Sequence, residues 1–223
     1  MRLAIESSPH APPGAQRLAD AAQPVREAIA IGVAVLAAAS LVWTPGKEAP
    51  LPALGWAASF LLLAVHQDVR SLRIPNWLTF PALLGAIALG AVHAGLAGAG
   101  FALLGAATAL GVGFIPFALR WLGAGDVKAG MVLGALWGAE TYLGVFWWML
   151  VVGGLLAVAF VAAQGGLLDL LGRWLRSAHA TVLTRRLTYF RPAAGSAAAH
   201  GLPFAVAMAL GAGAFQIWGT PWK

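Results

Sequence analysis

The chain has no cysteine and very little charge. Of its 223 residues, 14 are Lys or Arg and eight are Asp or Glu. Without cysteine there is no disulfide framework, no thiolate nucleophile and no cysteine-ligated zinc. Charged residues make up 10% of the chain and hydrophobic residues 60%, whereas a soluble domain is about 25% charged. We therefore expect lipid to cover most of the surface, which excludes an ordinary soluble enzyme.

Apolar runs of nearly spanning length follow one another along the chain. A helix needs about 20 residues to cross the hydrocarbon core of a bilayer. Seven runs qualify or nearly do: Ala28–Trp43, Leu51–Val65, Trp77–Val92, Gly98–Leu119, Val127–Gly138, Tyr142–Ala163 and Gly201–Trp218. The fifth is short and lies close to the sixth, so it is a half-span or one arm of a tight helical hairpin. The sequence predicts an all-α polytopic membrane bundle in which residues 28–223 form one domain.

Two polar stretches flank or interrupt these runs. Residues 1–27 form a polar tail that we expect on the cytoplasmic side, and residues 164–199 form a basic loop. Within this loop, apolar residues recur at helical spacing opposite charged ones, which predicts an amphipathic helix on the membrane surface. The first run loosely resembles a secretory signal, but the long region before it contains prolines and acids, which favours a retained span.

The distribution of basic residues predicts the orientation. With seven spans, every Lys and Arg except Lys47 and Lys223 falls on the same side of the membrane. Cytoplasmic segments collect Lys and Arg, so the amino terminus is expected in the cytoplasm. Because this placement accounts for the net charge of +6, we predict no nucleic-acid partner.

Two acidic residues are candidates for chemistry, because ionisable groups at membrane depth are costly. Asp68 closes the second run and Asp126 precedes the fifth. The topology places both at a similar depth on the cytoplasmic side, where they can meet. When two carboxyls come within hydrogen-bond reach, one keeps a proton and the other acts as a base. Such a pair can activate a water and protonate a departing amine, as in aspartic proteases.

Residues next to Asp126 have supporting roles to weigh. Gly123 and Gly125 would let a substrate backbone approach the acid closely. Lys128 would tune the carboxyl pair or bind a substrate carbonyl, or it would simply extend to the interface. The inert alternatives are an ion pair of Asp68 with a nearby arginine and an N-terminal helix cap for Asp126. The histidines show no ligand spacing, so we predict no metal site and no cofactor.

Two strings of residues carry a family resemblance. Residues 68–79 read D-x-R-x-x-x-I-P-N-x-L-T, and residues 123–128 read G-x-G-D-x-K. With these motifs, residues 54–218 resemble the type IV prepilin peptidases, a family of polytopic aspartic peptidases. The resemblance implies that Asp68 and Asp126 are the catalytic pair. It also implies that the protein cleaves the basic leader from prepilins and pseudopilins at the cytoplasmic face of the bacterial inner membrane, for pilus biogenesis or secretion.

The chain also departs from larger members of that family. It lacks their cysteine-rich insertion, so N-methylation of the trimmed pilin is not expected, and its size resembles the compact form that serves tight-adherence (Flp) pili. Two other functions remain open. One is a non-catalytic transporter or assembly subunit whose acids bind protons or cations. The other is a presenilin-like intramembrane protease, although Gln67 stands where presenilins have Tyr.

Overall fold

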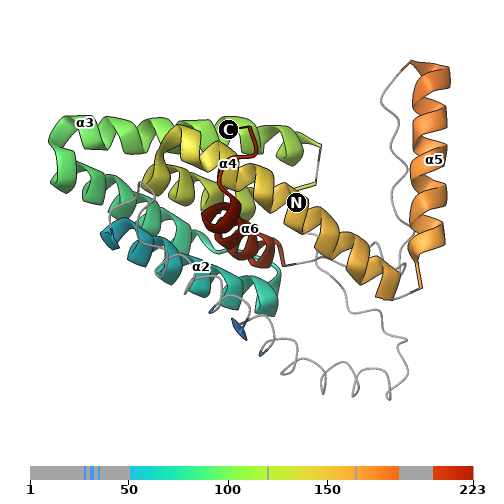
Figure 1. Cartoon of the computed structure of the whole chain (residues 1–223), viewed down its shortest axis with the longest axis horizontal. Helices are drawn as coiled ribbons and strands as arrows, with labels where there is room; N and C mark the ends of the chain where they lie inside the picture. The colour runs from blue at the N-terminus through green and yellow to red at the C-terminus, as the bar shows by residue number, and fades with distance from the viewer. Residues whose placement is uncertain are drawn as a thin grey trace.

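The computed structural model describes residues 51–119, 121–163, 165–185 and 203–222, with a few positions between 28 and 35. Within these ranges every regular element is an α-helix, which confirms the predicted class for this part of the chain. The helices, drawn in Figure 1, are α2 (Leu51–Ser71), α3 (Asn76–Ala118), α4 (Ala124–Ala163), α5 (Leu167–Thr184) and α6 (Phe204–Trp218). The polar tail and nearly all of the first predicted span lie outside the described residues.

The two long helices, α3 and α4, each fold back on themselves. In α3 the bend lies at Ala94 and Gly95, where Gly95 has φ 59° and ψ −142°. In α4 it lies at Gly138, with φ 78°. Glycine adopts these left-handed conformations without the penalty that a Cβ brings. Figure 1 shows α3 returning beside itself as two antiparallel arms. The short fifth predicted run is the first arm of α4, and it ends at the predicted position.

Both long helices are apolar and long enough to cross a membrane. Their four arms coincide with the third to sixth predicted runs, while α2 and α6 coincide with the second and seventh. The apolar helix α6 is shorter, with 15 residues. These elements indicate a membrane protein, and the count of seven spans stays a prediction.

Close backbone contacts hold the helices together. A Cβ on Gly105 of α3 would overlap the carbonyl of Gly134 in α4, so the two arms cross with nothing but glycine between them. The second arm of α4 packs against α6 in the same manner, because a Cβ on Gly211 would lie 2.6 Å from the backbone nitrogen of Met149. Helices in lipid associate through such close approaches, since lipid tails are as apolar as the side chains.

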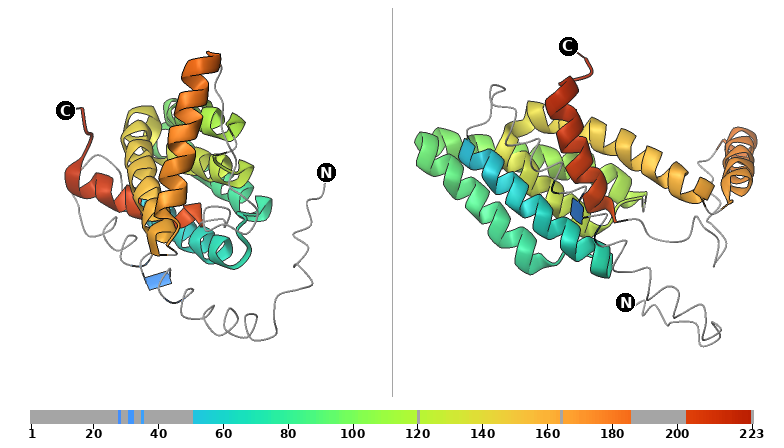
Figure 2. Two further views of the ribbon diagram at one scale, coloured as in Figure 1. Left: turned by 90° about the vertical axis from the view of Figure 1, so that its right-hand side faces the viewer. Right: turned by 60° about the horizontal axis from the view of Figure 1, so that its bottom comes forward.

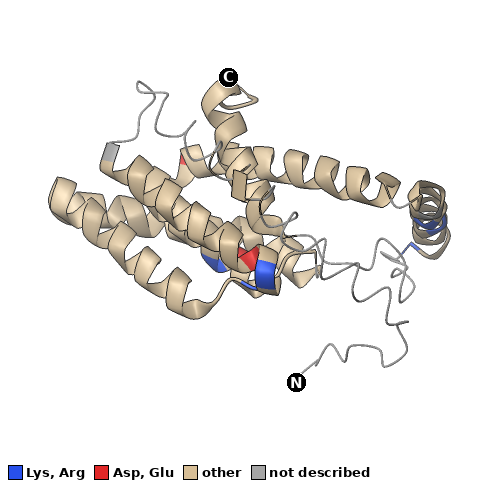
Figure 3. Ribbon diagram, turned by 90° about the horizontal axis from the view of Figure 1, so that it is seen from below, with Lys and Arg blue, Asp and Glu red and all other residues tan. Residues whose placement is uncertain are grey.

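The bundle has two different ends. The bends of α3 and α4 form one end, where His93, Ala94 and Leu136 line a small apolar cavity of about 330 Å³. At the other end, the last turn of α2 meets the first turns of α3, α4 and α6. Most described Lys and Arg lie at this second end and on α5, as Figure 3 shows in blue.

Helix α5 stands apart from the bundle and runs across the direction of α4 (Figures 1 and 2). Its apolar face is open: Leu168 is 82% exposed and Leu175 is 72% exposed. The predicted amphipathic helix in the 164–199 loop is therefore present as α5. Its position on a membrane surface stays a prediction.

Candidate active site

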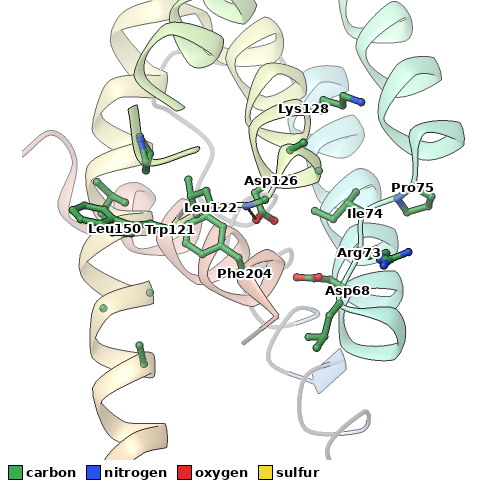
Figure 4. A pocket seen from close by; sticks show the side chains of 18 of the residues that line it. Asp68, Arg73, Ile74, Pro75, Trp121, Leu122, Asp126, Lys128, Leu150 and Phe204 are labelled. Atoms are coloured by element: carbon green, nitrogen blue, oxygen red, sulfur yellow. Dashed lines mark hydrogen bonds between the residues drawn. The ribbon is translucent and has the colours of Figure 1, made fainter. Parts of the chain in front are cut away.

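A cleft of about 1110 Å³ opens at the end of the bundle where α2, α3, α4 and α6 begin or end. Asp68 lines it from α2 and Asp126 lines it from α4. Ile74 and Phe204 also line this cleft. Figure 4 shows both carboxyl groups directed into this space. The structure thus brings together the two acids that the sequence singled out.

Asp68 is held by the first turn of α6. Its side chain is 4% exposed, and its Oδ2 accepts a hydrogen bond of 2.9 Å from the backbone N–H of Ala205. The first N–H groups of a helix have no partner within the helix, and the positive end of the helix dipole favours a carboxylate there. Asp68 therefore caps α6 and joins it to the end of α2. No local pattern in the sequence predicts this contact, because Ala205 lies 137 residues downstream.

Asp126 is held by the first turn of its own helix. Its Oδ2 accepts a hydrogen bond of 2.8 Å from the N–H of Gly123. In return, the carbonyl of Gly123 accepts bonds from the N–H groups of Asp126 and Val127, at 3.1 and 3.3 Å. Asp126 therefore supplies one half of a capping box, because its side chain reaches back to the N-cap residue Gly123, which has no side chain to complete it. Asp126 thus contributes to the cap of its own helix, and the bonds from Ala205 to Asp68 and from Gly123 to Asp126 both end on Oδ2.

The loop from α2 to α3 forms part of the wall of the cleft, and its residue Ile74 lies beside the start of α4. Helix α2 ends with Leu72 in the left-handed region at φ 49°, where the N–H of Leu72 bonds to the carbonyl of Asp68 at 2.7 Å. A non-glycine residue in this region carries a conformational cost of about 1 to 2 kcal/mol. The turn buries Ile74, which is 6% exposed, against the start of α4.

The two glycines before Asp126 have a role inside the chain. A Cβ on Gly125 would lie 3.1 Å from the carbonyl oxygen and 3.3 Å from the nitrogen of Ile74. A Cβ on Gly123 would lie 3.2 Å from Oδ2 of Asp126. Gly125 therefore lets the two aspartate-bearing segments approach each other, and Gly123 leaves room for the side chain of Asp126. The predicted role of Gly123 and Gly125 in admitting a substrate backbone stays a prediction.

Lys128 connects the starts of α3 and α4. Its Nζ donates a hydrogen bond of 2.8 Å to Oδ1 of Asn76 and lies 5.2 Å from the centre of the Phe80 ring. In Figure 4 its amino group points away from Asp68 and Asp126. The structure thus gives Lys128 a positioning contact, and its predicted contact with substrate stays a prediction.

The site offers carboxyl chemistry in a largely apolar cleft. Two carboxyls that line one cleft repel each other when both are ionised, which favours a proton on one of them. Within the described residues, no three side chains of His, Asp or Glu gather into a possible metal site. The arrangement fits general acid and base chemistry.

Comparison with known proteins identifies the central part of the chain. Residues 56–158 match the sequence model described as the type IV leader peptidase family. The matched segment contains Asp68, Asp126 and the loop that joins α2 to α3. No curated protein and no solved structure matches the chain. Residues 56–158 thus match the type IV leader peptidase family, as the resemblance of the two motifs predicted.

Proposed function

We propose that the protein is a membrane aspartic endopeptidase that removes the leader peptide from type IV or Flp-type prepilins and pseudopilins. Asp68 and Asp126 are the catalytic pair in this proposal. The observation that carries it is that both carboxyls line one cleft within a chain whose residues 56–158 match the leader peptidase family. No cofactor takes part in the proposed reaction.

In the proposed mechanism the pair holds one proton. The ionised carboxyl takes a proton from a water, whose oxygen attacks the carbonyl carbon of the scissile bond. The protonated carboxyl hydrogen-bonds to the carbonyl oxygen as negative charge develops there. The C–N bond then breaks, a proton passes to the departing amine, and a carboxylic acid and an amine result. Asp126 lies in the first turn of α4 and Asp68 accepts a bond from the first turn of α6, so the positive end of a helix dipole faces each carboxyl.

We place the reaction at the cytoplasmic face of the inner membrane. Arg73 and Lys128 line the cleft that holds the two acids, and Arg173 and Arg176 lie on neighbouring α5. Basic residues favour the cytoplasmic side. A cut at this end removes a leader on the cytoplasmic side and leaves the apolar helix of the precursor in the membrane.

Single substitutions test the proposal with purified protein and a synthetic precursor. Asp68→Asn and Asp126→Asn each keep the size of the side chain and remove its acid function. We expect both variants to insert normally and to lose cleavage. Glu140→Gln is the matched control, because it changes an acid near the opposite end of the bundle, beside the bend at Gly138. Processing by either aspartate variant at the wild-type rate would refute the assigned pair.

Mapping the products separates the remaining alternatives. Mass spectrometry should place the cut between the basic leader and the apolar segment of the precursor. A cut inside the apolar segment would favour the presenilin-like function. An intact precursor together with ion-coupled uptake into proteoliposomes would favour a transporter.

A further inference from the structure

The cleft that holds the two aspartates continues along the second arm of α4. There it is lined by Leu150, Gly154 and Ala157 of α4, Trp174 of α5 and Phe204 of α6. We call these five residues the α4 groove. In Figure 4, Leu150 and Phe204 lie across the open space from Asp68.

The groove is open because α6 covers only part of α4. Helix α6 begins at Phe204, whose ring would lie 3.1 Å from a Cβ on Gly153. Beyond that point a Cβ on Gly154 would have no atom within 4 Å. Val158, one turn further, is 47% exposed. In the part of the chain that the structure describes, the last turns of α4 therefore have an uncovered side beside the two acids.

The size and chemistry of the cleft match a short piece of helix. A helix with its side chains is about 10 Å across, so 1110 Å³ corresponds to roughly 14 Å of helix, or about nine residues. All five groove residues are apolar, and the acids lie on the facing wall. A helix satisfies its own backbone groups, whereas an irregular peptide would leave polar groups against this apolar wall.

We propose that the α4 groove binds the apolar helix of the precursor that follows the scissile bond, alongside the second arm of α4. The inference rests on the proposed function and names the surface that would hold the substrate. Because groove and acids share one cleft, a helix in the groove presents the residue before its first turn to Asp68 and Asp126. Gly154 lets the backbone of this helix approach α4 as closely as Gly105 lets α3 approach it.

Cross-linking tests the occupant of the groove, since the chain has no cysteine of its own. Gly154→Cys is combined with Asp126→Asn, which keeps the precursor intact, and single cysteines are placed along the apolar helix of the precursor. We expect disulfides at positions spaced three or four residues apart. Gly111→Cys is the matched control: it is also exposed, has no atom within 4 Å of a Cβ, and lies a similar distance from the corresponding end of its helix.

Two cross-linking results would overturn the inference. The first is an equal yield of disulfide to the precursor from Gly154→Cys and Gly111→Cys, or no disulfide from either, although the precursor co-purifies with the protein. The other is a disulfide between Gly154→Cys and Ala38→Cys of the same chain, or between two copies of Gly154→Cys. Residues 28–43 or a second copy of the chain would then fill the groove.

A second measurement uses bulk instead of a cross-link. Gly154→Trp places a large side chain in the groove from a position where a Cβ has no atom within 4 Å. We expect cleavage of the full precursor to fall by at least about tenfold, the equivalent of about 1.4 kcal/mol. The fall should be larger for the full precursor than for a short peptide that lacks the apolar helix, and Gly111→Trp should affect neither substrate. Normal cleavage of the full precursor by Gly154→Trp would reject the groove. Loss of activity in the aspartate variants would still support the catalytic pair.

Discussion

The contact between Lys128 and Asn76 leads to a prediction that separates a positioning role from a substrate-binding role. The ammonium donates a bond of 2.8 Å to the Asn76 side chain and lies 5.2 Å from the Phe80 ring. A hydrogen bond to a charged group contributes about 1.5 to 3 kcal/mol, but Asn76 is exposed, so we expect about 1 kcal/mol. An exposed cation–π contact adds about 0.5 to 1 kcal/mol. Lys128→Met should therefore destabilise the protein by about 1.5 to 2 kcal/mol, and Asn76→Leu by about 1 kcal/mol.

A double-mutant cycle measures whether these two residues act together. If Lys128 works through Asn76, the double variant should lose about 1 kcal/mol less than the two single variants combined. The free energy of unfolding in detergent gives one readout, and the cleavage rate gives another, where about 1 kcal/mol corresponds to roughly fivefold. Lys128→Arg is the control that keeps the charge. The positioning role is refuted if Lys128→Met lowers cleavage by the same factor with or without Asn76 and leaves stability unchanged.

Two further predictions follow from the crossing of α3 and α4 and from the paired acids. Gly105→Val forces a side chain into the carbonyl of Gly134, so it should cost about 1 to 3 kcal/mol of stability or prevent folding. The control Gly111→Val lies on the same helix with open space around its Cβ and should not destabilise the protein. Equal melting temperatures of the two variants in detergent would contradict the close crossing of α3 and α4. The rate of cleavage should rise and then fall with pH, because only the singly protonated pair is active; a rate that stays constant over the full titration of the pair would contradict a shared proton.

Local features of the chain were predictable from its sequence. The apolar runs predict the helices, because a segment's length and composition decide whether it can cross a bilayer. The short fifth run predicts the break near Gly138. The amphipathic spacing within the 164–199 loop likewise predicted α5. The two motifs identified Asp68 and Asp126, because acids are rare and costly beside apolar spans.

Features that depend on distant contacts were not predictable. The bond from Ala205 to Asp68 joins residues 137 positions apart, and no local pattern announces it. The sequence also does not show that Gly125 lies against Ile74, so it predicts only a substrate-facing role for this glycine. The sequence alone leaves several roles open for Lys128, because its partner Asn76 lies 52 residues away. Each of these contacts arises from how the helix ends assemble, which a local reading of sequence does not fix.

In the proposed mechanism Asp68 and Asp126 act as one unit, and the most direct test compares three variants. The cleavage rate of purified Asp68→Asn, Asp126→Asn and the double variant is measured on the same precursor. Groups that act as a unit show strongly non-additive losses. We predict that each single variant is as inactive as the double variant. Additive losses would contradict the shared role. In that case each single variant would keep some activity, and the double variant would lose activity by the product of the two single factors.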